Sequence, residues 1–279
     1  MLLQIAGLPA STYHYWRARF DDPTFPQVDA RAVAAVAKFD DEKGRYGYRR
    51  IRLLLQDDGI FLSRKTVYRL LKRHNRSCRI RARRYNSYRG SIGVVAPNLV
   101  QRCFHRNRPN QLWVTDVTEF KVAGRKVYLS AIMDTFNNEI VGYSTAVSPT
   151  VSFVTRSLKQ ALASRLIPAG MIIHSDQGFQ YQHRTWRNIL AQAGCKQSMS
   201  RKGNCYDNAP IESFFGHMKD EMHMTTTYTS VPELIQAIDD HIRWYNYERI
   251  QEKLGGMTPK QFRVTHTEFH PACYPALVA

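Results

Sequence analysis

The stretch "QLWVTDVTEFKV" (Gln111–Val122) alternates apolar and polar residues, which is typical of a β-strand with one face on a core. Successive side chains of a strand point to opposite faces, so Asp116, Thr118 and Phe120 share one face and Glu119 lies on the other. Asp116 is thus a carboxylate in the middle of an apolar strand. Burying an unpaired carboxylate is costly, so the pattern predicts a charged or metal partner for Asp116.

The elements that follow predict the rest of the fold. "KVYLSAIMD" and "EIVGYSTAV" are β-rich and are separated by the turn-like "TFNN", which indicates an antiparallel meander with the first strand. Hydrophobic periodicity then predicts a helix at 152–166, a strand at 171–176, a helix at 185–194 and a short strand at 196–200. This order predicts an α/β, ribonuclease-H-like core with a mixed sheet over residues 110–225.

Two more carboxylates lie at element ends in this region. Asp176 closes the strand "MIIHSD", and Glu212 lies in the first turn of the helix "APIESFFGHMKDEM". Three carboxylates without a His/Cys cluster favour a hard cation, Mg²⁺ or Mn²⁺. Two such ions about 3.5–4 Å apart can activate a nucleophile and stabilise a leaving oxygen in phosphoryl transfer. The competing interpretation is that each acid is a helix cap or a surface ion pair.

Basic residues are concentrated in the N-terminal part of the chain. The 279 residues contain 40 Lys and Arg against 23 Asp and Glu, a formal net charge of +17. Residues 1–108 hold 23 basic and 8 acidic residues, and residues 109–279 hold 17 and 15. Such an excess indicates a polyanionic partner, with nucleic acid favoured over an anionic membrane surface. No apolar run is long enough to span a bilayer.

The basic segment has a helical pattern. "RRIRLLLQDDG" (49–59) is followed by Ser63, a suitable N-cap, and then by "RKTVYRLLKRH" (64–74). Two helices joined by a short Gly-containing turn, the second strongly basic, indicate a helix-turn-helix-like module at 43–90. An N-terminal helical segment (1–42) precedes it, and an irregular linker (91–109) follows. The residues predicted to contact DNA here are Arg64, Lys65, Arg69, Lys72 and Arg73 of the helix, and Arg81, Arg83 and Arg84 of the basic tail after it.

The cysteines and the N-terminus bear on location. The five cysteines are scattered and form no CxxC pair, which fits a reducing cytoplasm and argues against a disulfide framework or a structural zinc site. The first residues lack a basic region and a long apolar stretch, so we expect no signal peptide.

Three blocks of the sequence resemble a known family. "WVTDVTEF", "HSDQGFQY" and "NAPIESFFGHMK" are similar to the acidic blocks of insertion-sequence transposases with a retroviral-integrase-like core. Asp176 and Glu212 are separated by 35 residues, as in the DD(35)E signature of that family. "YGYRRIRLLL" and "HIRWYNYERIQEKLGGMTPKQF" resemble the helix-turn-helix and C-terminal blocks of the OrfB product of the two-frame group. The resemblance extends from about Tyr13 to Phe262.

The resemblance implies a transposase that cleaves and joins DNA strands at the ends of a mobile element. Asp116, Asp176 and Glu212 would bind two Mg²⁺ (or Mn²⁺) ions, and a water or a DNA 3′-OH would attack a phosphodiester in line. Lys219 follows Glu212 by seven residues on the same helix face and is expected to contact DNA phosphate, and Gln177 to touch DNA. The implied partner is double-stranded DNA, bound by at least a dimer in the cytoplasm, within the bacterial nucleoid.

Other residues are expected to support the acids. Gly178 permits a tight turn after Asp176, and Asn208 is expected to cap the catalytic helix and fix Glu212. Asp207 is expected to favour the dipole at that helix N-terminus. His174 is expected to pack below the site, and a Ser175–Asp176–His174 catalytic cluster is rejected because its geometry cannot relay a proton.

Residues 226–279 are expected to form a helical C-terminal appendix. In the two-frame group the active enzyme carries a further helix-turn-helix and a leucine zipper from the upstream frame. The chain begins near the start of the downstream frame, so the upstream-frame product is a possible partner for recognising the element ends. Two alternatives stay open: a non-catalytic DNA-binding regulator derived from a transposase, and a ribonuclease-H-type nuclease that cuts without joining.

Overall fold

The computed structural model of the chain describes residues 13–14, 25–78, 95–201, 205–223 and 227–267. It divides into two compact units, Met1–Arg79 and Ile80–Ala279. Each unit has its own buried apolar residues. The tail residues Arg81, Arg83 and Arg84, which were predicted to contact DNA, lie outside the described residues.

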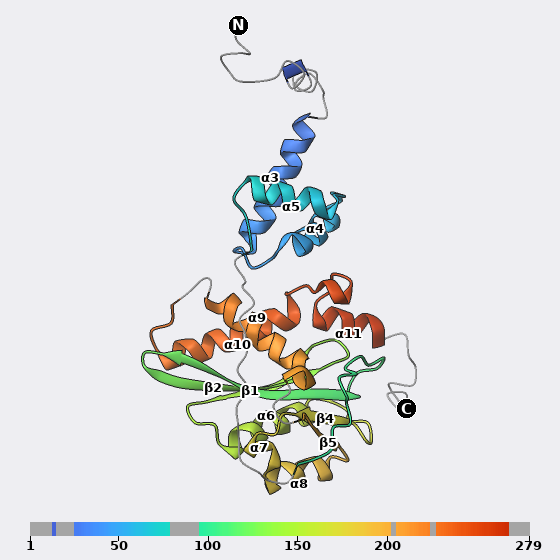
Figure 1. The fold of residues 1–279 in the computed structure, drawn as a ribbon, viewed down its shortest axis with the longest axis vertical. Helices are drawn as coiled ribbons and strands as arrows, with labels where there is room; N and C mark the ends of the chain where they lie inside the picture. Colours follow the sequence, from blue (N-terminus) through green and yellow to red (C-terminus); the bar gives the residue numbers. More distant parts are fainter. Residues whose placement is uncertain (1–12, 15–24, 79–94, 202–204, 224–226, 268–279) are drawn as a thin grey trace, which may run out of the picture. The chain divides into compact units, whose positions relative to one another are not determined.

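Between residues 25 and 78, the described part of the first unit folds into α3 (Phe25–Asp41), α4 (Tyr48–Asp57) and α5 (Arg64–Arg73), each in contact with the other two (Figure 1). Ile51, Leu55 and Val67 are fully buried between them. The Ser63 hydroxyl accepts a hydrogen bond from the Thr66 N–H and so caps α5. The predicted two-helix pattern therefore exists, with α3 as a third helix.

The second unit is built on a five-stranded mixed sheet with the order β3-β2-β1-β4-β5. Its strands are β1 (Leu112–Val122), β2 (Arg125–Asp134), β3 (Ile140–Ala146), β4 (Ile172–Ser175) and β5 (Lys196–Met199). The first three form an antiparallel meander, whereas β4 pairs parallel to β1 and β5 parallel to β4. The predicted ribonuclease-H-like mixed sheet is confirmed.

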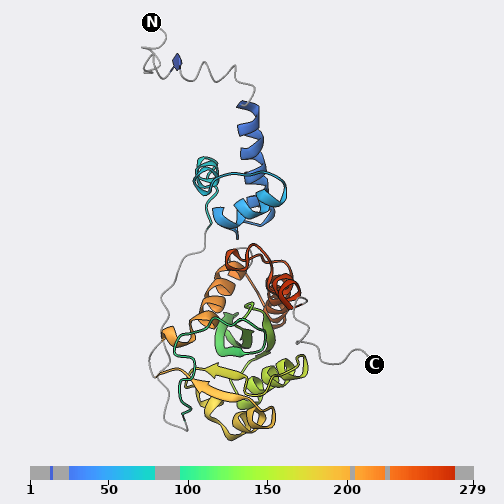
Figure 2. The same cartoon turned by 90° about the vertical axis from the view of Figure 1, so that its right-hand side faces the viewer.

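Helices cover both faces of this sheet (Figure 2). On one face, α9 (Ala209–His223) and α10 (Val231–Tyr247) pack on a cluster that includes Val114 and Phe120 of β1. On the other, α6 (Val151–Ala163) and α8 (Arg184–Gln192), with the short α7 (Phe179–Gln182) beside them, pack on a cluster around Trp113. Asp116 has the strand parity of Val114 and Phe120, so it lies on the α9 face.

The segment expected to be a linker is attached to the edge of the sheet. The Pro97 carbonyl accepts from the Met199 N–H at 3.4 Å, and the Leu99 N–H donates to the Ser198 hydroxyl at 2.9 Å. Val100 is buried. Residues 97–100 therefore lie along β5, the outer strand, and cover backbone groups that an edge strand otherwise exposes.

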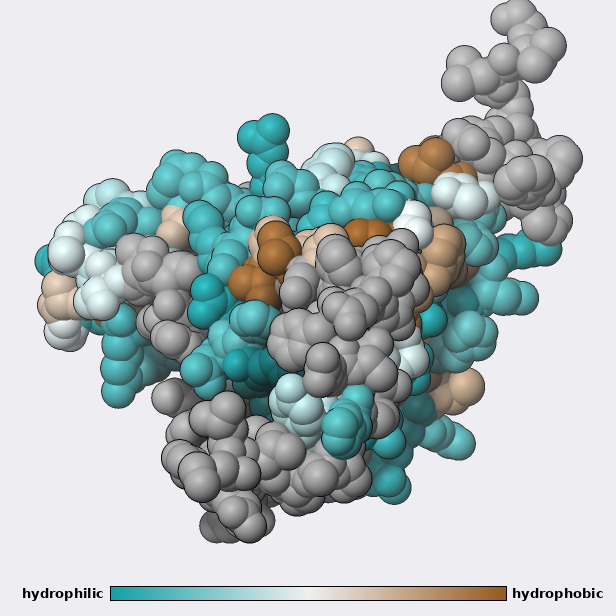
Figure 3. Space-filling model, turned by 90° about the horizontal axis from the view of Figure 1, so that it is seen from above, coloured by the Kyte–Doolittle hydropathy of each residue, from teal (hydrophilic) through white to brown (hydrophobic). Residues whose placement is uncertain are grey.

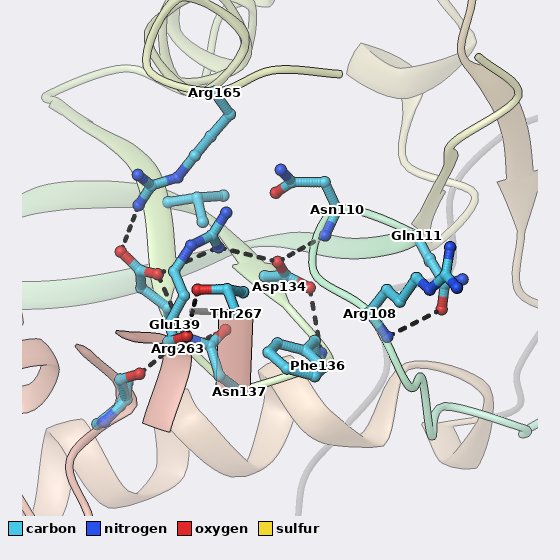
Figure 4. A network of polar contacts seen from close by, with 12 residues as sticks. Arg108, Asn110, Gln111, Asp134, Phe136, Asn137, Glu139, Arg165, Arg263 and Thr267 are labelled. Atoms are coloured by element: carbon cyan, nitrogen blue, oxygen red, sulfur yellow. Dashed lines mark hydrogen bonds and ion pairs between the residues drawn. The ribbon is translucent and has the colours of Figure 1, made fainter. Parts of the chain in front are cut away.

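The C-terminal helix α11 (Pro259–Thr267) is held by a network of charged groups (Figure 4). Glu139 is buried and forms ion pairs with Arg165, Lys260 and Arg263. Asp134 is also buried and accepts from the Asn110 and Phe136 N–H groups, so it closes the turn after β2. Burial raises the pKa of Asp134 to about 6 despite these bonds and the nearby Arg263.

A second buried ion pair joins α9 to the chain after α10. Arg249 Nη2 lies 2.6 Å from Glu221 Oε1, and its Nε donates to the same carboxylate. Both side chains are almost fully buried. The pair fixes α9, the helix that carries Glu212, to the C-terminal part of the unit.

The described surface seen in Figure 3 is mostly hydrophilic, with a few small hydrophobic patches. Within the described ranges, no helix is both long and apolar enough to cross a membrane.

Candidate active site

Asp116 and Asp176 are brought together by the pairing of β1 with β4. These parallel strands align Trp113 with Ile173 and Val114 with His174. Two residues further along each chain are Asp116 and Asp176. Because both chains run in the same direction, continuing this register sets Asp116, within β1, beside Asp176, which directly follows β4.

Glu212 approaches this pair from a helix. It lies in the first turn of α9, which packs against β1 through Ile211, Phe214 and Phe215. The helix is therefore held on the face of the sheet that carries Asp116. These apolar neighbours of Glu212 in sequence anchor the helix, while Glu212 itself stays half-buried.

The three carboxyl groups perturb one another electrostatically. Burial, followed by the charge of Asp176 and then that of Glu212, raises the pKa of Asp116 well above its ordinary value. Burial also raises the pKa of Asp176. Burial and the charge of Asp176 raise the pKa of Glu212 to about 7. Like charges held close together in a desolvated place are typical of functional sites that bind a cation.

Local turns orient two of the carboxylates. Asp116 Oδ1 accepts from the Val117 N–H at 2.7 Å, and Asp176 Oδ1 accepts from the Gly178 N–H at 2.8 Å. A Cβ at position 178 would lie 2.9 Å from Asp176 Oδ1. Glycine is therefore needed at 178 because the carboxylate approaches its backbone closely, and not because of a left-handed conformation: its φ is −57°.

His174 is a packed support beneath the carboxylates. Its Nε2 lies 2.7 Å from the Asp207 carbonyl oxygen, which can only accept, so Nε2 carries the proton. Its Nδ1, 2.8 Å from Ser198 Oγ, then accepts from that hydroxyl. Burial lowers the pKa of His174, in keeping with this neutral form. The ring thus ties β4 to the turn that leads into α9, the helix that carries Glu212.

Asn208 does not cap α9, and that prediction was wrong. Residues Cys205–Asn208 form a 3-10 turn that continues directly into α9, so Asn208 already has a helical conformation in place of the extended one of an N-cap. Its side-chain Nδ2 instead donates to the Thr115 carbonyl at 3.1 Å. The residue joins the start of α9 to β1, next to Asp116.

Asp207 is buried and accepts hydrogen bonds from several side chains. From the sequence, it was expected only to favour the dipole at the N-terminus of the helix. It is fully buried and accepts from Arg201 Nε, Arg102 Nε and Asn98 Nδ2 at 2.9, 2.9 and 3.1 Å. The hydrogen bonds from Arg201, opposed by burial and helped by Arg102, hold its pKa well below the ordinary range. Arg102 lies 105 residues earlier in the chain, so no local pattern indicates this contact.

The other predicted contact residues lie in different places. Lys219 Nζ is 5.4 Å from the centre of the Phe120 ring, on the Asp116 face of β1, and burial lowers its pKa. Gln177 donates from Nε2 to the Ser200 carbonyl, so part of its amide is used within the protein. Five basic side chains of α5 are exposed, but they belong to the other unit: Arg64, Lys65, Arg69, Lys72 and Arg73.

The donor set suits a hard divalent cation. Carboxylate oxygens are the ligands that Mg²⁺ and Mn²⁺ prefer, and a bound cation would offset the repulsion and desolvation that raise the pKa of these acids. In the part of the chain that the structure describes, no three His, Cys, Asp or Glu side chains converge closely enough to hold an ion without adjustment. Asp116 and Asp176 are close enough for the charge of Asp176 to raise the pKa of Asp116.

Comparison with protein families gives three matches. The integrase core domain matches residues 106–205 and a second integrase core domain family matches residues 212–266. An HTH-like domain matches residues 28–84, which include all three helices of the first unit except the start of α3.

Curated relatives match almost the whole chain. The putative transposase InsK for insertion sequence element IS150 of Escherichia coli (strain K12) is 42% identical over 94% of this chain and 92% of its own. The transposase for insertion sequence element IS904 of Lactococcus lactis is 32% identical over 86% and 96%. The transposase InsF for insertion sequence IS3A of Escherichia coli is 31% identical over 81% and 80%.

Solved viral structures align with this chain. The simian T-cell lymphotropic virus intasome in complex with PP2A regulatory subunit B56 gamma aligns with a TM-score of 0.50 and 18% identity, over 82% of this chain and 74% of that chain. The HTLV-2 integrase catalytic core domain, solved in complex with magnesium, aligns with a TM-score of 0.46 and 21% identity over 56% of this chain and 97% of that chain.

Proposed function

Because this chain belongs to the IS3 family of insertion-sequence transposases, of the OrfB type with an integrase core and an HTH-like domain, we propose that Asp116, Asp176 and Glu212 carry out its DNA strand cleavage and joining. The observation that carries the proposal is the β1–β4 register, which aligns Asp116 with Asp176. The charge of Glu212 on α9 also raises the pKa of Asp116, which supports the inclusion of Glu212 in the same site.

In this proposal the three carboxylates hold two Mg²⁺ or Mn²⁺ ions. When bound, such ions polarise a phosphodiester and lower the pKa of an attacking water or 3′-OH. The protein contributes the placement of the ligands. Gly178 leaves room for the Asp176 carboxylate, and Asn208 and His174 fix α9 to β1 and β4. We further propose that Lys219, whose pKa is affected by the charge of Asp116, contacts a DNA phosphate near the scissile bond, and that Gln177 touches DNA.

Cation binding should depend on pH. The pKa of Glu212 is raised to about 7, so in the metal-free protein this group contributes stability that is present below its ordinary pKa and is lost as the pH rises through about 7. A divalent cation needs the ionised carboxylates. We therefore expect Ca²⁺, a hard cation that also takes carboxylate oxygens as ligands, to raise the Tm more at about pH 8 than at about pH 5.5.

A matched variant gives the control for this expectation. Glu212→Gln has no group that titrates near neutral pH at that position, so the pH step in the Ca²⁺-dependent gain should shrink. An equal gain in Tm at both pH values in the wild-type protein would remove Glu212 from the cation site. Thermal unfolding followed by circular dichroism is sufficient for both proteins.

We propose that the exposed basic side chains of α5 bind the phosphate backbone of double-stranded DNA. Replacing Arg69, Lys72 and Arg73 together with Ala should weaken DNA binding. It should also flatten the dependence of log K on log salt by about 0.9 for each phosphate that is no longer neutralised, because fewer counterions are released. Lys38→Ala is the matched control: Lys38 lies in the same unit but is paired with Asp58 at 2.9 Å. An unchanged salt slope in the triple variant would refute this role.

A strand-transfer assay tests the function as a whole. Paired element ends with a free 3′-OH, a target duplex and Mg²⁺ should yield joined products, and at least two chains are expected to act because two ends must be joined. Mg²⁺-dependent nicking without joining would favour a nuclease. DNA binding without any cleavage would favour a regulator or indicate that the upstream-frame product is required. Adding the upstream-frame product to the assay distinguishes these two cases. We expect this chemistry to take place in the cytoplasm, on nucleoid DNA.

A further inference from the structure

Tyr206 is an exposed aromatic residue at the entrance to the catalytic helix. It is 69% exposed, more than any other Phe, Tyr or Trp that the structure describes between residues 95 and 267. It lies in the 3-10 turn Cys205–Asn208, six residues before Glu212. A ring of this size exposed beside the proposed catalytic residues is a candidate for substrate contact.

The backbone that carries Tyr206 is fixed next to the acids. The residue after it, Asp207, is buried, and its carbonyl accepts from His174, two residues before Asp176. The next residue, Asn208, donates to Thr115, the neighbour of Asp116. The turn that exposes Tyr206 is therefore hydrogen-bonded to both β1 and β4.

One arginine lies beside the ring, and a second shares its carboxylate partner. The guanidinium carbon of Arg102 is 5.6 Å from the ring centre, and Arg102 and Arg201 both bind the buried Asp207 carboxylate. The Arg102 and Arg201 side chains are nevertheless about half exposed, at 48% and 59%. Two positive charges against one negative charge leave a net charge of +1 on the surface next to the ring.

A nucleotide matches this combination of groups. A base offers a flat face for stacking and its phosphate offers an anion, and aromatic rings flanked by arginines bind unpaired nucleic acid in this way. Bases within a duplex are already stacked, so the ring can take only a base that has left the stack or lies at an end. A membrane or an acidic peptide would not require the aromatic face.

We infer that Tyr206 stacks on an unpaired base of the DNA strand next to the scissile phosphate, while Arg102 and Arg201 hold the phosphate of that nucleotide. The inference rests on the proposed function, because it assumes that DNA ends enter at the three carboxylates. It assigns a role in the reaction to a residue that neither ligates the cation nor belongs to the helix-turn-helix-like unit. Tyr206 would keep the strand end open for attack.

The test uses the full chain and a DNA end with 2-aminopurine beside the scissile phosphate. Stacking on an aromatic ring quenches this base, so wild-type protein in Ca²⁺ should quench it and Tyr206→Ala should not. Base stacking is worth about 1–3 kcal/mol, which corresponds to roughly 5–150-fold in binding or rate. Tyr206→Ala should therefore lower cleavage of fully paired ends by about tenfold or more, and Tyr206→Phe, which keeps the ring, should restore both signals.

Tyr247→Ala is the matched control. Tyr247 is also exposed, at 57%, and has a cation, Lys260, 5.5 Å from its ring centre, but it belongs to α10. It should leave quenching and cleavage unchanged, and unchanged Tm values would show that both variants fold. Wild-type quenching by Tyr206→Ala, or equal losses in Tyr247→Ala, would overturn the inference. Quenching is measured without turnover, so it can be read even if no cleavage occurs. Absence of cleavage would count against the proposed function alone.

Discussion

Asp176→Asn is expected to abolish DNA strand cleavage and joining while leaving DNA binding intact. Asn has the same shape but carries no charge, so the side chain can still accept from the Gly178 N–H yet cannot help to hold a divalent cation. A cation that stabilises the reacting phosphate contributes several kcal/mol, and each 1.36 kcal/mol is a factor of ten in rate. The expected loss is therefore at least about 10³-fold, measured with labelled element ends in Mg²⁺.

Asp116→Asn and Glu212→Gln are expected to have the same effect. Glu119→Gln supplies the matched control, because Glu119 lies on the same strand as Asp116 but on the opposite face, where it pairs with Lys126. It should keep activity. Joining that persists in any one of the three variants would exclude that residue from the cation site, while loss in Glu119→Gln would mean that general electrostatics, and not ligation, explains the results.

Arg249→Ala is expected to produce the largest loss of stability. It leaves the Glu221 carboxylate fully buried without the guanidinium that contacts both of its oxygens. Removing one partner of a buried ion pair typically costs about 3–5 kcal/mol, because the remaining charge loses the guanidinium that compensates it. His241 Nε2, 3.6 Å from Glu221 Oε2, stays in place in this variant. Since Glu221 lies on α9, the loss should also reduce the ordering of the catalytic helix. Chemical denaturation of the full chain measures the free energy of unfolding.

Lys126→Ala gives the comparison for this second prediction. The Lys126–Glu119 pair has a similar length, 2.9 Å, but its lysine side chain is 56% exposed. Solvent screens such a pair, so its loss should leave the free energy of unfolding almost unchanged. If Arg249→Ala proves as mild as Lys126→Ala, the remaining contacts of Glu221, among them His241, would be sufficient to compensate its buried charge.

The sheet and the carboxylates could be predicted because their signals are local. Alternation in β1 and the β-rich segments of β2 and β3 depends on adjacent residues, and the observed meander follows the predicted order. Asp116 could be singled out because a charged residue interrupts an apolar strand. From the sequence, the pairing that sets Asp116 beside Asp176 could be hypothesised but not determined, because no local pattern shows which residues of two strands pair.

The supports of the site could not be predicted for a related reason. Asp207 lies in a Gly- and Asn-rich loop and contacts Arg102 and Asn98, which are more than a hundred residues away. Asn208 is a residue type that favours the N-cap position, but it lies within a 3-10 turn that directly precedes α9. Both outcomes depend on tertiary packing, which overrides the preferences of single residues. The short helix α7 was missed because four residues are too few for a periodic pattern.

The attachment of residues 97–100 to the sheet also bears on contacts between two copies of the chain. The Pro97 carbonyl accepts from the Met199 N–H, and the Leu99 N–H donates to the Ser198 hydroxyl, so this segment lies against the end of the outer strand β5. The Ala96 N–H also meets Met199 Sδ. An open edge strand can pair with a strand of another molecule and so lead to aggregation. Because residues 97–100 already lie against this edge, pairing of two chains through the end of β5 would require their displacement.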